Sequence, residues 1–271
     1  MISKTTIRGK KGIKLNKPIL VVGLPGIGNV GKLVAEHLRR ELKAEKFATM
    51  YSPHFPHQVV MLKNGSVRLV NNRFYLIKSK KPAGNDIVLL IGDAQAMTPE
   101  GQYDVNNKIV DFFKNGLDGR FIYTIGGYNL NEGVVSKPRV FGNATSQKVI
   151  DQFKGTEIIF GKSRGMIWGS AGLIIAFAKM EKLDGVCLMG ETNFLEVDAS
   201  AAKAVIIQLS KKLNLNINTA DLDKIIEKTA KAIKELEKQM GNMNMGQQQQ
   251  QYIPIGDKDE HGDEHRPSYI R

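Results

Sequence analysis

The stretch Ile19-Leu20-Val21-Val22-Gly23-Leu24-Pro25-Gly26-Ile27-Gly28-Asn29-Val30-Gly31-Lys32 decides the fold. Its first six residues include a short apolar run, which is typical of a buried strand. Glycines follow at once, and residues 29–42 then place apolar side chains at helical spacing. A strand joined to a helix by a glycine-rich turn is the first half of a β-α-β unit, so the stretch predicts an α/β fold.

The same alternation continues along the chain to residue 213. Apolar runs are expected to form strands, and segments with helical periodicity to form helices. The expected strands are residues 19–24, 86–91, 121–125 and 185–189. The expected helices are residues 29–42, 99–114, 171–180 and 199–213, the last with Asp198 as its N-cap. We therefore expect a single α/β domain over residues 18–213, built on a mostly parallel sheet.

A β-rich insertion separates the first expected helix from the next long strand. Strands are expected at residues 46–51, 58–62, 67–70 and 74–77. Asn64-Gly65 is a strong signal for a hairpin turn, and Asn71-Asn72 is interpreted as a second turn. The insertion is thus predicted to form two hairpins at an edge of the sheet.

The glycine loop has two interpretations. Gly26, Gly28 and Gly31 have the spacing G-x-G-x-x-G, which together with Lys32 could hold a phosphate at the start of a helix. A dinucleotide site also needs an acidic residue about 20 residues further on, and a Walker A motif needs Ser or Thr where Leu33 stands. Because both are missing, we interpret the glycines as structural, serving a tight turn and close packing. The phosphate cradle stays open as an alternative.

Other reactive side chains form no recognisable catalytic set. Asp93 follows a central strand, but no nucleophile or histidine is predicted beside it. Ser170 lies outside a G-x-S-x-G elbow, because Trp168 takes the place of the first glycine. Cys187 is the one cysteine and lies in an apolar run, which indicates a buried residue. We expect neither a metal site nor a cofactor.

The composition argues against several classes of protein. The longest apolar runs are far shorter than the ~20 residues that cross a bilayer. Residues 1–17 form a basic arm with six basic and no acidic residues, and lack the apolar segment of a signal peptide. A cytoplasmic protein is therefore expected. The formal net charge is +12, but beyond the arm the surplus is dispersed and is not paired with stacking aromatic residues, so nucleic-acid binding is not favoured.

The C-terminal part of the chain divides into a helix and a tail. A helix is predicted over residues 219–240, with apolar residues at alternating separations of four and three. Those considered for contacts between subunits are Leu222, Ile226, Ile233 and Leu236. Packing of this helix against the chain's own sheet is an equal alternative. Residues 241–271 contain a glutamine run and many polar residues, which predicts a flexible tail.

Six segments in order along the chain carry a family resemblance. They are Gly23 to Gly31, Gly92-Asp93-Ala94-Gln95, Gly126-Gly127-Tyr128, Gly169-Ser170-Ala171-Gly172-Leu173, Leu188-Met189-Gly190-Glu191-Thr192, and Asp198 with Ala201-Ala202. Together they resemble the archaeal branch of the proteasome assembly chaperone family. The resemblance implies a three-layer α/β/α domain similar to the purine nucleoside phosphorylase fold, no established catalysis, and self-association, with a tetramer expected. It also implies binding to proteasome α-subunits or to the 20S core particle.

The resemblance also gives the last residues a role. Archaeal members of the family can carry a tail that ends in a hydrophobic residue, Tyr and any residue, and that docks between α-subunits. This sequence ends Ser268-Tyr269-Ile270-Arg271, with the tyrosine one position earlier. Tyr269, Ile270 and Arg271 are thus the candidate partner-binding residues, in a shifted register. Capture of a terminal carboxylate beside an aromatic anchor is the expected mechanism.

Two functions from different classes follow. The leading one is a non-enzymatic assembly chaperone or activator of the proteasome. The alternative is a nucleotide- or nucleoside-handling enzyme that uses the loop from Gly26 to Gly31 for phosphate, and Asp93 or Glu191 for acid–base work or ribose. The missing metal-binding hydroxyl and acidic ribose ligand favour the first function.

Overall fold

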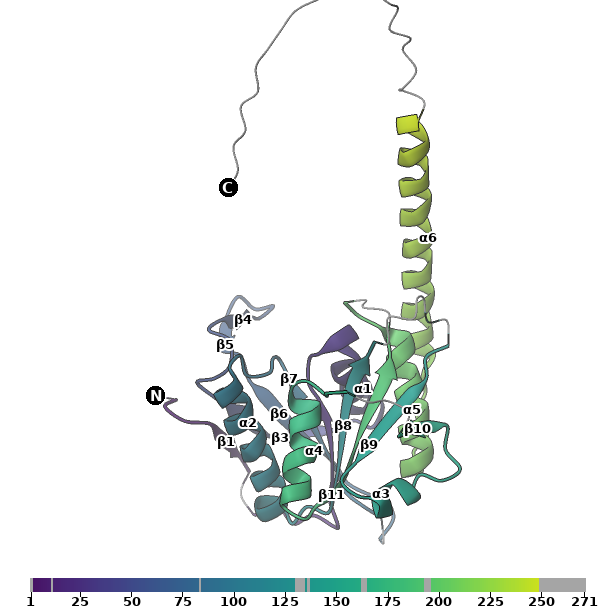
Figure 1. Ribbon diagram of the computed structural model, residues 1–271. Coiled ribbons are helices and arrows are strands. Elements are labelled where there is room, and N and C mark those ends of the chain that lie inside the picture. Colours follow the sequence, from purple (N-terminus) through teal and green to yellow (C-terminus); the bar gives the residue numbers. More distant parts are fainter. Residues whose placement is uncertain are drawn as a thin grey trace, which may run out of the picture. The chain divides into compact units, whose positions relative to one another are not determined.

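The computed structural model describes residues 2–10, 12–82, 84–129, 135, 137–161, 165–192 and 196–248, with side chains through residue 235. The chain divides into two units, Met1–Ile226 and Glu227–Arg271. The first unit holds a sheet covered by helices on both faces, which is the expected three-layer α/β fold (Figure 1).

Four parallel strands form the centre of the sheet. In spatial order they are β7 (Ile87–Gly92), β2 (Ile19–Gly23), β8 (Phe121–Tyr128) and β11 (Asp184–Glu191). Every residue of β2 and β7 is buried. Strands that are covered by helices on both faces have continuous apolar sequences. For this reason the positions of these strands could be predicted from the sequence.

The flanks of the sheet are mixed rather than parallel. On one side, β6 (Asn72–Ile77), β3 (Glu45–Tyr51) and β1 (Thr6–Gly9) continue the sheet by antiparallel pairing from β7 outward. On the other side, β9 (Val140–Ala144) pairs antiparallel with β11, and β10 (Ile158–Phe160) pairs parallel with β9. The expected parallel sheet therefore describes the centre, and strand β1 comes from the basic arm, which was not expected to join the sheet.

The insertion contains one hairpin and not two. Strands β4 (Val59–Met61) and β5 (Val67–Leu69) form a separate two-stranded sheet, with Gly65 in the left-handed region of the turn. The second predicted turn, at Asn71-Asn72, is wrong because Asn72 is the first residue of β6 and both asparagines are buried. At this point the chain enters the main sheet, because the backbone of β6 pairs with β3 on one side and with β7 on the other.

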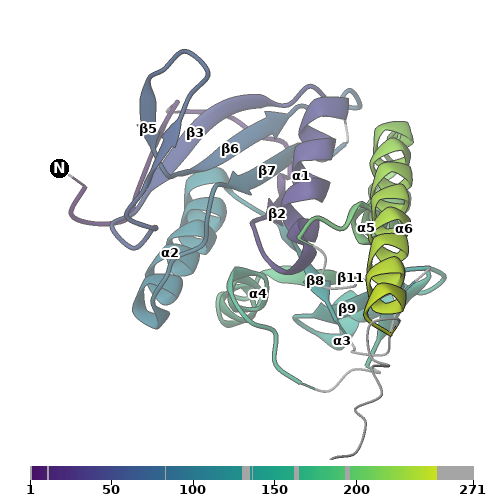
Figure 2. The ribbon, with the colours of Figure 1, turned by 90° about the horizontal axis from the view of Figure 1, so that it is seen from above.

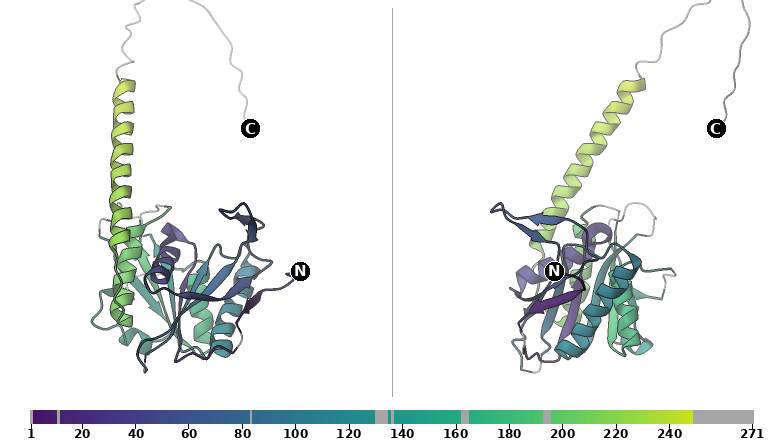
Figure 3. Two further views of the ribbon diagram at one scale, coloured as in Figure 1. Left: turned by 180° about the vertical axis from the view of Figure 1, so that it is seen from behind. Right: turned by 90° about the vertical axis from the view of Figure 1, so that its left-hand side faces the viewer.

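Two helical layers enclose the sheet. Helices α1 (Val30–Glu41), α3 (Gln147–Asp151) and α5 (Ala199–Leu213) cover one face. Helices α2 (Pro99–Asp111, continued by a π-helical turn at Phe112–Gly116) and α4 (Ser170–Met180) cover the other, as Figures 2 and 3 show. Alternate strand residues serve the two layers: Leu20 and Val22 pack under α2 and α4, whereas Ile19 and Val21 pack under α1 and α5.

The C-terminal helix is longer than predicted. Helix α6 spans Ala220–Gln248 and so continues eight residues past the expected end at residue 240. Residues 241–248 include two Met and two Gln, which are good helix formers, together with two Gly and two Asn, which are poor ones. Adding a residue to an existing helix costs much less than nucleating a new one. Its first turns belong to the first unit, where Leu222 is fully buried and Ile226 packs against the core beneath α1 and α5. The expected tail is therefore helical at its start, and residues 249–271 lie outside the described residues.

Candidate binding pocket at the carboxyl ends of the central strands

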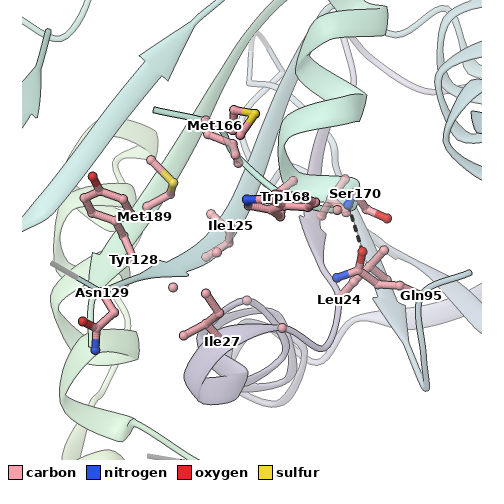
Figure 4. A pocket seen from close by; sticks show the side chains of 18 residues that line it. Leu24, Ile27, Gln95, Ile125, Tyr128, Asn129, Met166, Trp168, Ser170 and Met189 are labelled. Atoms are coloured by element: carbon pink, nitrogen blue, oxygen red, sulfur yellow. Dashed lines mark hydrogen bonds between the residues drawn. The ribbon is translucent and has the colours of Figure 1, made fainter. Parts of the chain in front are cut away.

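A pocket opens where the central parallel strands end. The helices that follow the adjacent strands β2 and β7 cover opposite faces of the sheet, and open α/β sheets bind ligands in the crevice that such a divergence creates. The cavity measures about 420 Å³. Its walls come from the ends of β2, β8 and β11, the glycine loop, the loop after β7, and the segment before α4 (Figure 4).

The glycine loop forms one wall and has a backbone that needs its glycines. Gly28 has a φ of 60°, in the left-handed region, and a Cβ there would lie 2.7 Å from Thr192 Oγ1. Gly31 lies in the first turn of α1, where a Cβ would lie 2.5 Å from the carbonyl oxygen of Ile125 on β8. Close approach of α1 to the sheet therefore depends on Gly31, as a tight strand-to-helix turn requires.

The loop offers little to a phosphate. Gly26 and Gly31 line the pocket, whereas Gly28 is buried against Thr192 and Asp198 and Lys32 is not part of the lining. None of the described lining residues is Asp, Glu, Lys, Arg or His. An anion placed there would lose its hydration without gaining a cationic partner from these residues.

A network of amide side chains holds the opposite wall. Gln95 donates through Nε2 to the carbonyl oxygen of Pro25 at 2.6 Å, and its Oε1 accepts from the backbone N–H of Ser170 at 2.8 Å. Gln102 donates to Ala96 O at 2.7 Å and accepts from the Ser170 hydroxyl at 3.2 Å. Ser170 is thus a structural link between α2 and α4, because its hydroxyl faces an amide and not a general base.

An exposed tryptophan stands at the mouth of the pocket. Trp168 is 82 % exposed, and the neighbouring Met166 and Ile27 are also exposed. Figure 4 shows Trp168 between Ile27 and Met166, with Gln95 and Ser170 on one side and Tyr128 and Asn129 on the other. In the sequence, Trp168 served only to exclude a nucleophile elbow at Ser170. A lone tryptophan in a loop between glycines was the available signal, because loops run over the surface and a large aromatic side chain there is available for binding.

The carboxylate of Asp93 does not indicate a catalytic role, because two arginines bind it. It accepts hydrogen bonds from Arg68 on β5, from Arg73 on β6 at 3.0 Å and from the backbone N–H of Asn71 at 3.1 Å. Burial opposes its ionisation, but these hydrogen bonds and charges outweigh burial and lower the pKa of Asp93 below its ordinary value. The carboxylate therefore fixes the hairpin to the end of β7.

Glu191 is held in the same way at the end of β11. It accepts from Nε of Arg139 at 2.8 Å, from Nη2 of Arg139 and from the backbone N–H of Arg139 at 3.1 Å. Chiefly through the side-chain hydrogen bond, Arg139 lowers the pKa of Glu191. Asp93 and Glu191 were the two carboxylates considered for an enzyme. Neither has a pKa that is raised toward neutral pH, as a general acid requires.

A second apolar surface lies on the hairpin. Val59 pairs with Leu69 and Met61 pairs with Val67, so the four side chains share one face of the two strands. All four are at least half exposed, and Met61 reaches 85 %. The opposite face is anchored, since Val60 packs against the core and Arg68 binds Asp93. We call these four residues the apolar hairpin face; clustered exposed apolar side chains of this kind mark interaction sites.

The remaining residues singled out by sequence are dispersed. Leu222 is buried in the core of its own domain, Ile226 is partly buried there, and Ile233 on α6 is 37 % exposed. Leu236, Tyr269, Ile270 and Arg271 have no described side chains. Cys187 is buried, and burial raises the pKa of its thiol to about 11.

The described residues contain no group of three or more metal-ligating side chains that could hold an ion. Among them, no helix combines the length and the apolar character that crossing a membrane requires.

Comparison with known proteins gives both sequence and structural matches. The model of the PAC2 family matches residues 20–237. The uncharacterized protein MJ1210 of Methanocaldococcus jannaschii is 36% identical over 245 residues, which cover 89% of this chain and 92% of that protein. The crystal structure of Pyrococcus furiosus PbaB, described as an archaeal proteasome activator, superposes with a TM-score of 0.82 at 38% identity and covers 87% of this chain and 100% of its own. That of Pyrococcus furiosus PbaA, described as an archaeal homolog of proteasome-assembly chaperone, shares the fold at 23% identity with a TM-score of 0.72, over 92% of this chain and 98% of its own.

Proposed function

Because this chain belongs to the PAC2 family, we propose that it is a non-enzymatic, cytoplasmic partner of the proteasome that self-associates and binds proteasome α-subunits. The observation that carries the proposal is the likeness to PbaB, which extends over the whole of that chain at 38% identity. Since PbaB is described as an activator and PbaA, at 23% identity, supports the fold alone, activation is the favoured role over assembly.

The two arginine-bound carboxylates support a non-enzymatic role. Asp93 and Glu191 have lowered pKa values and serve as anchors for the hairpin and for Arg139. A proton-transferring carboxyl group works best with a pKa near the working pH. The described lining of the pocket thus offers no cation for a phosphate, and neither Asp93 nor Glu191 belongs to that lining.

Two parts of the chain are proposed to contact the α-subunits. The first is the apolar hairpin face, which a protein partner would shield from water at roughly 25 cal/mol per Å² of apolar area. The second is the group Tyr269, Ile270 and Arg271, which would bind through the aromatic ring and the terminal carboxylate. Several such tails in one oligomer would raise the effective concentration of each.

Self-association is proposed to use α6. Ile233 is exposed at helical spacing from Ile226, and Leu236 continues the series in sequence. Leu222 is left out because it is buried in its own domain. Four chains, each contributing one helix, would give the expected tetramer.

The proposal is tested by size-exclusion chromatography with light scattering, on the protein alone and mixed with purified proteasome α-subunits. Co-elution of the full chain is expected without ATP. Deletion of residues 269–271 and, separately, Met61→Lys with Val67→Lys should each reduce co-elution, whereas Ser268→Ala should not. If the full chain does not bind α-subunits or assembled α-rings, the proposal fails. If both altered proteins bind as the full chain does, a different surface carries the contact.

A further inference from the structure

The pocket at the carboxyl ends of the central strands carries an inference that is independent of the proteasome. Its volume of about 420 Å³ lies in the range of small-molecule sites, roughly 300–1,000 Å³. We propose that it binds an uncharged, planar aromatic molecule that stacks on Trp168. Nothing in the family assignment or in the described relatives names such a ligand.

The uncharged character follows from the walls. The described lining residues include no acidic, basic or histidine side chain, so a charged ligand would lose hydration without an ionic partner among them. The side-chain amide of Gln95 is hydrogen-bonded to Pro25 and Ser170, and these bonds hold it in place as part of the wall. The rest of the lining is mainly aliphatic, aromatic and thioether, which favours apolar surface on the ligand.

The planar shape follows from the side chains that face the space. Trp168 offers a large ring, and Met166 and Met189 offer sulfur atoms, which make favourable contacts with aromatic rings. Gly26, Gly126 and Gly127 line the same space without side chains. A Cβ on Gly126 would lie 3.6 Å from the Ala171 Cβ and 3.9 Å from the Met189 Cγ, both ordinary contacts, so room remains beside β8 for a flat ring.

The pocket is already formed before a ligand arrives. Gln95 ties the glycine loop to the start of α4, and Gln102 ties α2 to the same residue, Ser170. A preformed site spares a ligand the cost of ordering loops. Trp168 is 82 % exposed at the mouth, and its ring would gain much shielding from water on binding.

The test uses the single tryptophan of the chain as the reporter. Protein labelled with 5-fluorotryptophan gives one ¹⁹F resonance, which is titrated with naphthalene-2-carboxamide and with naphthalene-2-carboxylate at pH 7.5. The two probes share shape and differ in charge. A saturable shift is expected with the carboxamide, and binding of the carboxylate should be about tenfold weaker or worse because its charge must be desolvated.

Two variants locate the binding, measured by calorimetry with the carboxamide. Gly126→Leu should fill the space beside Ala171 and abolish binding, whereas Gly126→Ala should retain it. Trp168→Ala, at an exposed position, should keep the melting temperature and weaken binding roughly tenfold by loss of stacking.

Three results would overturn the proposal. One is no saturable shift with the carboxamide. Another is equal affinity for both probes. The third is that Trp168→Ala changes the mass measured by light scattering while the native protein binds neither probe, which would assign the surface to a second copy of the chain. Whether the protein binds the proteasome affects none of these measurements, because no α-subunit is present in them.

Discussion

Asp93 joins segments that are distant in sequence. Its carboxylate binds Arg68 of the hairpin and Arg73 of β6, and it is only 12 % exposed. Two positive charges thus share one carboxylate inside a partly buried site. Removal of one member of such a set leaves the others without partners, which costs more than the pair contributes when intact.

We predict that Asp93→Asn lowers the free energy of unfolding by about 2–3 kcal/mol. Denaturant unfolding measures this loss, and hydrogen exchange should show faster exchange in residues 59–69 once the anchor of Arg68 is lost. Asp118→Asn is the matched control, because the Asp118–Arg120 pair is largely exposed and should contribute about 0.5 kcal/mol or less. Equal losses in the two variants would contradict the role of Asp93.

Glu191 gives a prediction about pH. Its pKa is lowered in the folded protein by Arg139, so its ionised form stabilises the fold fully above the unfolded pKa of about 4.3. That stability is lost as the pH falls through the lower folded pKa. Asp93 acts in the same direction, as does Asp86, whose burial is outweighed by bonds from Lys78 and from backbone N–H groups.

The free energy of unfolding is therefore expected to fall below about pH 4, and Glu191→Gln should make that fall shallower because Gln does not titrate. Denaturant titrations at pH 7.0, 5.5, 4.0 and 3.0 provide the measurement. The variant is also expected to be less stable at pH 7, since Arg139 then loses its ion pair with the Glu191 carboxylate. Parallel curves for the two proteins below pH 4 would indicate that Glu191 has the same pKa in the folded and the unfolded protein.

At the scale of elements, the contact between α1 and the sheet depends on Gly31 and not on Gly26. A Cβ added at Gly31 would lie 2.5 Å from the carbonyl oxygen of Ile125. A Cβ added at Gly26 would have Gln95 Nε2 as its nearest neighbour, at 3.8 Å. Only one of the two therefore has a steric reason to be glycine. The G-x-G-x-x-G pattern does not distinguish them, because spacing says nothing about what approaches each residue.

Gly31→Ala is expected to destabilise the protein by about 1–3 kcal/mol, because α1 must move away from β8 to admit the methyl group. Gly26→Ala should leave stability within about 0.5 kcal/mol. Thermal unfolding of both variants, in parallel, makes the comparison. If Gly31→Ala is neutral, the close approach of helix and strand is not what requires glycine at that position.

At the scale of the whole molecule, helix α6 belongs in part to the domain core and is also the helix proposed for self-association. Its first turns are part of the domain core through Leu222 and Ile226, and Ile233 is exposed. A substitution at Ile226 would thus disturb folding and association together. Ile233 separates the two effects.

We predict that Ile233→Lys reduces the oligomer to a smaller species, while the circular dichroism spectrum and melting temperature of the domain are preserved. The reason is that a lysine in an apolar seam must be desolvated on association. Light scattering gives the mass, and Ala232→Lys, at a neighbouring exposed position, serves as the control. A tetramer that survives Ile233→Lys would remove this part of α6 from the interface.

The sequence by itself determined the elements whose signals are local. The buried strands β2, β7, β8 and β11, the helices between them and the N-cap Asp198 were all predicted at close to their observed places, because periodicity, glycine turns and caps act within a few residues. The first hairpin turn was correct for the same reason. The second was wrong, because a polar pair such as Asn71-Asn72 also suits a buried strand entry when Asp93 supplies a partner.

Only the tertiary structure decided what the ends of those elements form together. The Arg68–Asp93 anchor joins residues 25 positions apart, and Gln95 meets Ser170 across 75 positions. Trp168 lines the same pocket as Gly26 and Gly31 of the glycine loop. Such contacts depend on which strands become neighbours, and the order β7-β2-β8-β11 is a property of the packed sheet. Local propensity cannot encode that order, because the free energy that selects it comes from burying both faces of the sheet at once.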